Sequence, residues 1–178
     1  MTEDKDVQKR IAREKLAQQG NVAAQYNLAV MYCDGIGGEQ SFEKALYWFE
    51  KAAMQGEGNA HYALGSMYYQ GQGVRKSYEK AAQWYIKGAN QNDKKAQYML
   101  GVIYERGQGV EVSHEKSAYW YEKAAEQGFV EAQSAVAYKY YKGEGVAQSY
   151  FNAAYWFAKA AEQGQAIAQY NLAVCYTD

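Results

Sequence analysis

Proline is absent from this sequence of 178 residues, whereas glycine occurs 17 times and tyrosine 19 times. Turns must therefore depend on glycine, which adopts a left-handed backbone without steric cost. No apolar run approaches the roughly 18–20 residues that span a bilayer, so we expect no membrane insertion. The charged start, MTEDKDVQKR, lacks the apolar core of a secretory signal. The sequence as it stands predicts a cytoplasmic protein, or an exported one if a signal segment has been removed.

The sequence also lacks an excess of charge and any cluster of metal-binding residues. The formal net charge is -1, and lysine and arginine are spread along the chain. This distribution differs from the basic surface with which proteins neutralise nucleic-acid phosphates. The two histidines, His61 and His114, fall in different predicted helices, and no Cys/His/Asp/Glu spacing is typical of a metal site. We expect no nucleic acid, no metal and no cofactor.

A unit of 36 residues repeats along the chain without insertion or deletion. A fixed period of this length is the sequence signature of a solenoid, in which each repeat packs only on its neighbours. We therefore predict one repeat domain spanning residues 1–178. It consists of a half repeat at 8–23, full repeats at 24–59, 60–95, 96–131 and 132–167, and a partial repeat at 168–178.

Cysteine is scarce, and the two that occur, Cys33 and Cys175, lie about four repeats apart. Stacked helix pairs advance on the order of 10 Å each, the spacing of packed helices. A disulfide needs Cα atoms within roughly 7 Å of one another. We therefore expect no disulfide within the chain, which fits a reducing compartment without proving one.

Each repeat reads as two helices. In the first, Ala24, Leu28 and Tyr32 share one face through their spacing of four residues. Glycines end this helix, and a serine then provides the N-cap of the second helix. The second helix ends at glycine in three copies and at Asn92 in copy two. The predicted helix-ending glycines are Gly35, Gly71, Gly107 and Gly143, and the predicted capping serines are Ser41, Ser77, Ser113 and Ser149.

A tryptophan recurs in phase in every second helix, as Trp48, Trp84, Trp120 and Trp156. Repetition at one position favours core packing over ligand stacking, because the fold, not a single ligand, imposes the same residue on every copy. A small residue recurs in every first helix, as Ala29, Gly65, Gly101 and Ala137. We interpret it as a point of close approach between two helices.

The copies have the form A-x-x-x-L-G-x-x-Y-x-x-G-x-G-V followed by K-A-x-x-W-Y-x-K-A-A-x-Q-G. This pattern resembles the Sel-one-like repeat, a relative of the tetratricopeptide repeat, over about residues 8–178. The resemblance implies an all-α, right-handed α/α superhelical solenoid, here of ten helices. It also implies a scaffold for contacts between proteins, as in bacterial members of this family.

The serine of the turn and a lysine three residues later form S-x-x-K in copies one to three, beginning at Ser41, Ser77 and Ser113. The same motif carries the nucleophile of serine β-lactamases, together with S-D-N and K-T-G. Neither of these partner motifs occurs here. Cysteine-rich relatives linked to β-lactam hydrolysis carry a cysteine pair in each repeat, which this chain lacks. We therefore interpret the serines as helix caps and expect no enzymatic activity.

The most informative positions point away from the packed face of the first helices. In solenoids of this kind the first helices line a concave binding surface. Tyrosine and arginine dominate interface hot spots, and copy four departs most from the others, placing Lys139 where they have Met31, Met67 and Ile103. The candidate partner-binding residues are Tyr62, Tyr69, Tyr98, Val102, Glu105, Arg106, Tyr138, Tyr141 and Lys142.

These observations predict a non-catalytic scaffold that binds a partner protein or peptide. Three alternatives stay open: a toxin-neutralising protein of the immunity type, a hydrolase acting on β-lactam or cell-wall material, and a structural spacer. The array also opens with an unpaired second helix and closes with an unpaired first helix. Leu172, Val174 and Tyr176 should then lack cover, which suggests either self-association or a longer array.

Overall fold

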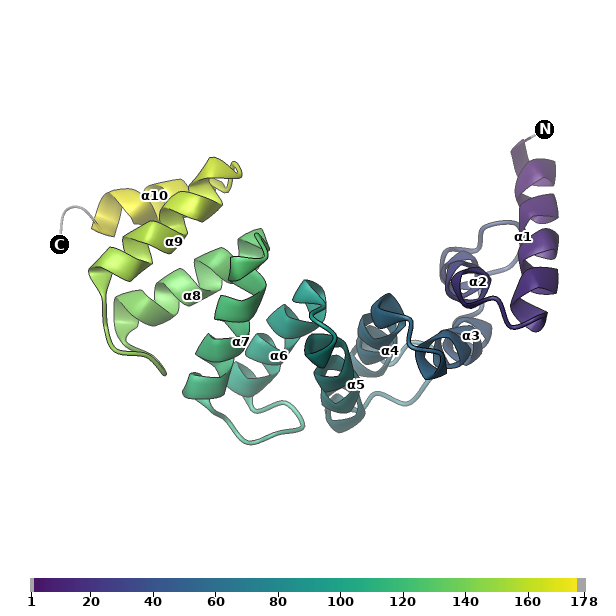
Figure 1. Cartoon of the computed structure of the whole chain (residues 1–178), viewed down its shortest axis with the longest axis horizontal. Coiled ribbons are helices and arrows are strands. Elements are labelled where there is room, and N and C mark those ends of the chain that lie inside the picture. The colour runs from purple at the N-terminus through teal and green to yellow at the C-terminus, as the bar shows by residue number, and fades with distance from the viewer. Residues whose placement is uncertain (1, 176–178) are drawn as a thin grey trace. The chain divides into compact units, whose positions relative to one another are not determined.

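The computed structural model describes residues 2–175, with side chains from residue 5 onward, and this range contains ten α-helices and no strand (Figure 1). The all-α expectation and the expected number of helices are therefore confirmed. The helices are α1 (Thr2–Gln18), α2 (Val22–Asp34), α3 (Phe42–Met54), α4 (Gly58–Gln70), α5 (Tyr78–Asn90), α6 (Lys94–Arg106), α7 (His114–Glu126), α8 (Val130–Lys142), α9 (Tyr150–Glu162) and α10 (Ala166–Cys175).

The helices alternate as the repeat predicts. Helices α2, α4, α6 and α8 are the first helices of the four copies, and α3, α5, α7 and α9 are the second helices. The chain divides into two compact units, one ending at Gly88 and one beginning at Ala89. Within the first unit α1, α2, α3 and α4 pack in chain order, and within the second α6 to α10 do the same. Contacts between consecutive helices thus build each unit.

The predicted helix ends are confirmed. Each first helix ends at a glycine with a left-handed backbone, at Gly35, Gly71, Gly107 and Gly143. After α5, Asn92 takes the place of the glycine that ends the other second helices. It has φ of +66° and is the one non-glycine residue with positive φ in the described range. Asparagine tolerates this conformation better than most residues, which explains the exchange.

The predicted serine caps are confirmed as well. The hydroxyl oxygens of Ser41, Ser77, Ser113 and Ser149 accept a hydrogen bond from the backbone N–H three residues later, at 3.2–3.3 Å. The backbone N–H of each serine donates to a tyrosine carbonyl of the preceding helix, at 2.9–3.0 Å. Side chain and backbone of one residue therefore join the two helices of each repeat.

The core of each repeat contains a fully buried aromatic ring, but this ring does not belong to tryptophan. Trp48, Trp84, Trp120 and Trp156 are half-buried at the edge of the packing. The residue after each tryptophan is buried instead, with 1–3% of its surface exposed: Phe49, Tyr85, Tyr121 and Phe157. The tryptophans thus pack against the core as expected, although from its edge, and the ring that lies between the two helices is one position further along.

The buried ring packs on the small residue of the first helix. A Cβ atom placed on Gly65 would lie 2.6 Å from the Tyr85 ring, and one on Gly101 would lie 2.4 Å from the Tyr121 ring. The two copies with alanine instead have phenylalanine: Ala29 shares a buried cluster with Phe49, and Ala137 shares one with Phe157. Glycine is thus paired with tyrosine and alanine with phenylalanine throughout the chain.

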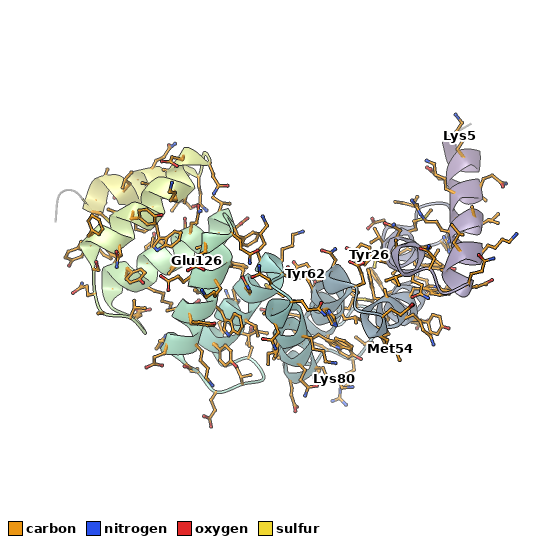
Figure 2. All side chains as sticks on the ribbon, viewed as in Figure 1. Lys5, Tyr26, Met54, Tyr62, Lys80 and Glu126 are labelled. Carbon is orange, nitrogen blue, oxygen red and sulfur yellow. The ribbon has the colours of Figure 1, made fainter. Side chains whose placement is uncertain are left out.

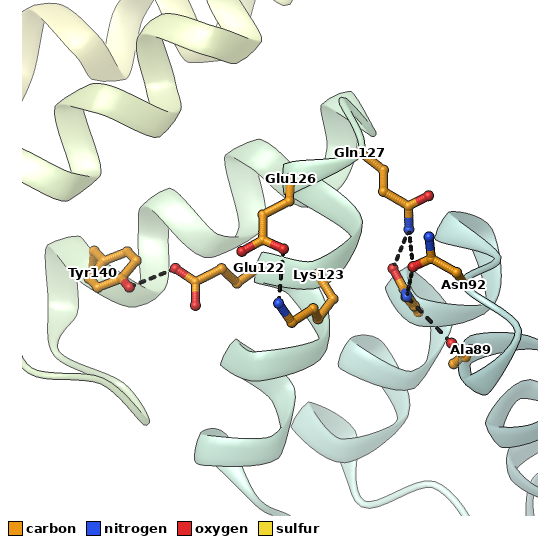
Figure 3. A network of polar contacts seen from close by, with 8 residues as sticks. Ala89, Asn92, Glu122, Lys123, Glu126, Gln127 and Tyr140 are labelled. Carbon is orange, nitrogen blue, oxygen red and sulfur yellow. Dashed lines mark hydrogen bonds and ion pairs between the residues drawn. The ribbon is translucent and has the colours of Figure 1, made fainter.

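Buried glutamines link successive repeats in a pattern that sequence analysis missed. The side-chain amide of Gln97 donates to the Ala89 carbonyl at 3.4 Å, and its oxygen accepts from Gln127 at 2.8 Å. Figure 3 shows the Gln127 end of this network, with Asn92 and the Ala89 carbonyl. Gln25 with Gln55 and Gln133 with Gln163 repeat the arrangement. The side-chain amide of each buried glutamine therefore donates to a carbonyl of the preceding helix and accepts from a glutamine side chain at the end of the following helix.

We predict that Gly101→Ala lowers the free energy of unfolding by about 1–3 kcal/mol, the usual effect of overpacking a core. The added methyl group meets the Tyr121 ring, which hydrogen bonding holds in place. Gly101→Ala combined with Tyr121→Phe reproduces the Ala137–Phe157 pair, and its loss of stability should be smaller than the sum of the two single losses. A double-mutant cycle by urea unfolding measures this coupling. Strict additivity would show that ring and small residue do not constrain one another.

Candidate functional site

Six of the nine predicted binding residues line one hollow of about 310 Å³ in the second unit. It is bordered by α6, α7 and α8. The six predicted residues are Tyr98, Val102, Glu105, Arg106, Tyr138 and Lys142, and the hollow also includes Tyr121, Ala135, Lys139 and Glu144. We call this the charged hollow. Val102 is only 8% exposed and contributes to the floor.

A second hollow of about 240 Å³ is bordered by α8, α9 and α10, and we call it the tyrosine hollow. Its lining consists of Tyr138, Tyr141, Phe157, Tyr170, Asn171 and Val174. Tyr138 lines both hollows and is held from two sides. Its hydroxyl oxygen accepts a hydrogen bond from the Asn171 side chain at 2.6 Å, and its ring meets Phe157 edge-on at 5.2 Å. The two hollows are therefore neighbours that share a fixed aromatic wall.

Tyr62 and Tyr69, the remaining predicted residues, belong to the first unit. The Tyr62 ring, labelled in Figure 2, lies 5.8 Å from that of Tyr85, and the Tyr69 ring lies 5.0 Å from that of Tyr78. Both side chains are half-buried. They pack on the second helix of their own repeat, and neither lines the two hollows just described.

A buried lysine lies at the centre of the charged hollow. The Lys139 side chain is only 3% exposed, yet its position in the other three copies holds Met31, Met67 and Ile103. Its ammonium group lies 2.7 Å from Glu105 of α6 and 3.1 Å from Glu144. Two carboxylates thus compensate one desolvated cation. Sequence comparison among the copies detects the unusual lysine but not its two partners.

Hydrogen bonds further fix the Glu105 carboxylate. The Tyr121 hydroxyl donates to it at 2.9 Å. Burial, followed by the negative charge of Glu105, raises the pKa of Tyr121 above its ordinary value, so this hydroxyl stays protonated and acts as a donor at neutral pH. The hydrogen bond from Lys139 lowers the pKa of Glu144 below its ordinary value. Glu144 therefore stays ionised.

The S-x-x-K motifs have a structural explanation. The lysine ammonium groups lie over tyrosine rings of the preceding helix, 5.3 Å from the ring centre for Lys44 on Tyr32. The same distance is 5.3 Å for Lys80 on Tyr68 and 5.2 Å for Lys116 on Tyr104. The serine caps the helix, while the lysine makes a cation–π contact. Both residues of the motif therefore join consecutive helices.

The last helix leaves one face uncovered. Tyr170 is 72% exposed and Ile167 65% exposed. Ala173 is exposed, although its equivalents in the four full copies are buried, and Leu172 and Val174 are only half-buried. Leu172 is thus less covered than its fully buried equivalents, such as Leu28 and Leu64. Val174 is as half-buried as Val30 at the same position of copy one, and Tyr176 lies outside the described residues. A further exposed apolar side chain lies at the end of α3, in the first unit, where Met54 is 80% exposed (Figure 2).

Over the described range, neither Cys33 nor Cys175 forms a disulfide. No group of three or more His, Cys, Asp or Glu side chains in residues 2–175 could hold a metal ion. None of the helices in this range combines the length and apolar character of a membrane span.

The family model of the Sel1 repeat matches residues 22–57, 58–93, 94–129, 130–165 and 166–178. Each matched repeat begins two residues before the corresponding repeat predicted from sequence periodicity, so that the first one begins at Val22, the first residue of α2. No curated protein matches the sequence significantly.

Several solved structures are similar to this chain. A protective antigen of uropathogenic Escherichia coli strains, described as displaying an SLR fold, is 34% identical with a TM-score of 0.89. The match covers 92% of this chain and 35% of the antigen. A Sel1 repeat protein from Oxalobacter formigenes is 37% identical with a TM-score of 0.87, covering 94% of this chain and 49% of that protein. This chain thus spans between a third and a half of both relatives.

An immunity protein from Pseudomonas aeruginosa is also similar, with 18% identity and a TM-score of 0.51. The match covers 90% of this chain and 81% of the immunity protein. At this level of identity the likeness concerns the fold alone.

We predict that Lys139→Met leaves the free energy of unfolding unchanged or raises it, because it removes the cost of burying a charge while the two carboxylates left behind, 38% and 41% exposed, stay hydrated. Methionine occupies this position in copies one and two. By contrast, Glu105→Gln should lower stability by about 1–3 kcal/mol, since Lys139 then loses a charged partner. Urea unfolding compares the two variants. A larger loss for Lys139→Met than for Glu105→Gln would contradict this account.

We also predict a pH dependence for the ion pair. The pKa of Glu144 is lowered from its ordinary value of 4.5 in the folded state. Its contribution to stability is therefore present above about pH 4.5 and is lost as the pH falls through the lowered value. NMR titration should show the Glu144 pKa rising towards 4.5 in Lys139→Met. Unchanged titration in that variant would show that Lys139 does not cause the shift.

Proposed function

Since the chain belongs to the Sel1 repeat family, whose members generally serve as protein-interaction scaffolds, we propose that it is a non-catalytic scaffold for a partner protein. The partner binds across the charged hollow and the tyrosine hollow of the second unit. The observation that carries this proposal is that the two hollows share Tyr138, which is 41% exposed. A single polypeptide segment can therefore contact both.

The rigidity of the lining supports a binding role. Tyr138 is fixed by Asn171 and Phe157, and the Tyr98 ring packs 5.6 Å from Tyr121 and 5.1 Å from Phe129. Side chains that are already ordered lose little conformational freedom on binding. Tyrosine and arginine are also the residues that most often supply the energy of protein interfaces. The surface thus combines anchoring residues with a low cost of ordering.

The local chemistry favours binding over catalysis. In S-x-x-K the lysine that would have to activate the serine contacts a tyrosine ring instead. In the charged hollow, the buried lysine is committed to two carboxylates. A nucleophile needs a base within hydrogen-bond reach, and in both arrangements the lysine that could serve as this base is engaged with another group. The immunity protein from Pseudomonas aeruginosa shares the fold with this chain, which adds no argument for toxin neutralisation here.

We predict that the chain retains a partner protein from a lysate of the cells that express it, and that Tyr138→Ala with Lys142→Glu abolishes retention. These changes remove the wall common to both hollows and reverse a cation at the rim. Tyr155→Ala with Lys159→Glu is the matched control on α9, because Tyr155 is 50% exposed and Lys159 is likewise accessible. Affinity capture with mass spectrometry reads out the result.

Circular dichroism and urea unfolding first establish that both variants fold. Loss of the partner from the first variant alone supports the proposed surface. Equal retention by both variants would place the interaction elsewhere on the chain, and absence of any retained protein would contradict the scaffold role.

A further inference from the structure

We infer, on the basis of the proposed function, that the partner presents an acidic segment with a neighbouring bulky apolar residue. A carboxylate of this segment pairs with Arg106 and Lys142 at the charged hollow. The apolar side chain enters the tyrosine hollow beyond Tyr138. The ligand chemistry is thus that of an acidic, apolar linear peptide.

The charged hollow contains more cations than carboxylates, and only some of these groups form close ion pairs. Three cations, Arg106, Lys139 and Lys142, line it together with two carboxylates, Glu105 and Glu144. Both carboxylates bind the one buried cation, Lys139, at 2.7 and 3.1 Å. Both carboxylates are therefore engaged with Lys139, and the three cations of the hollow exceed its two carboxylates by one.

The two outer cations remain available to a ligand. Arg106 is exposed and makes no ion pair with any residue in the described range. The Lys142 side chain is 58% exposed, and its ammonium group lies 4.0 Å from Glu144, at the limit of an ion pair. Glu144 meanwhile receives the shorter contact from Lys139. An incoming carboxylate would thus meet two cations without strong partners.

A cationic ligand fits this hollow poorly. It would have to draw Glu105 or Glu144 away from Lys139, whose side chain is 3% exposed. A buried ammonium group that loses its partners strongly destabilises the protein. An anionic ligand leaves both Lys139 ion pairs in place and competes only with the 4.0 Å contact between Lys142 and Glu144. The buried lysine therefore acts as a positioning residue that selects against cations and leaves Arg106 and Lys142 for anions.

The tyrosine hollow accounts for the apolar residue of the proposed ligand. Its lining includes the rings of Tyr138, Tyr141, Phe157 and Tyr170, together with Val174. A volume of about 240 Å³ lies below the roughly 300–1,000 Å³ of sites that enclose whole small molecules. It suits one large apolar side chain. Because Tyr138 separates the hollows, the acidic and apolar residues of the ligand should be close in sequence.

The other copies do not offer this combination. The positions of Arg106 and Lys142 hold Asp34 in copy one and Gln70 in copy two. The position of Lys139 is apolar in those copies, with Met31 and Met67 buried. Within the array, only copies three and four supply the two cations. The acidic specificity therefore belongs to this one pair of repeats.

A displayed library of random dodecapeptides, selected on the immobilised full chain, tests the inference. We expect enrichment of Asp or Glu within a few residues of Phe, Leu, Ile or Met. Arg106→Glu with Lys142→Glu should shift the preference from acidic to basic residues. The best wild-type peptide should bind this variant about 10–100-fold more weakly by fluorescence anisotropy. Lys94→Glu with Lys159→Glu makes the same change in net charge away from the hollow, and it should keep the acidic preference.

Each other outcome overturns the inference. Acidic enrichment lost equally in both charge-reversed variants would indicate attraction to overall charge rather than a site. Enriched peptides without acidic residues, or a library that yields no motif, would exclude an acidic linear ligand. The proposed function fails separately, when the natural partner is retained despite Tyr138→Ala with Lys142→Glu. The two failures are therefore distinguishable.

Discussion

The close contact between a small residue and a buried ring underlies every repeat of this protein. Where the small residue is glycine, as at Gly101, the ring comes so near that a Cβ atom would lie 2.4 Å from it. The partner ring is then a tyrosine, and its hydroxyl reaches the charged hollow, where Tyr121 binds Glu105. Alanine accompanies phenylalanine, which has no hydroxyl to satisfy. The packing that closes the helix pair thus also decides whether a polar group reaches the candidate binding surface.

The buried Lys139 places a charge in the core that the fold does not require. Methionine or isoleucine fills this position in the other copies and needs no compensation, whereas an ammonium group requires ion pairs from two directions. One partner, Glu105, comes from the preceding repeat, and the other, Glu144, follows α8 in the chain. An arrangement that stability alone does not demand is most simply explained by what it does to the hollow, where it engages both carboxylates and leaves Arg106 and Lys142 to face a ligand.

Features imposed equally on every copy could be predicted from sequence. The capping serines and the helix-ending glycines, with Asn92 as the exception, were found because four copies show the same residue type at the same phase. The recurring tryptophans were correctly predicted to pack on the core, but periodicity did not show that the following ring, Phe49 and its equivalents, is the fully buried one. The glutamine pairs and the ion pair of Lys139 with Glu105 escaped prediction, because the paired residues belong to different helices about 30 residues apart and periodicity carries no information on such contacts.

Repeat architecture also explains why one junction can carry a specific site. Each helix pair contacts only its neighbours, so the charges that surround Lys139 affect the packing of two repeats and leave the others unchanged. The uniform positions maintain the helices, and the variable positions of α6 and α8 are free to differ in charge and size. A partner that reads Arg106, Tyr138 and Lys142 together therefore recognises a feature of one junction, although the backbone beneath it is the same repeat that recurs along the whole array.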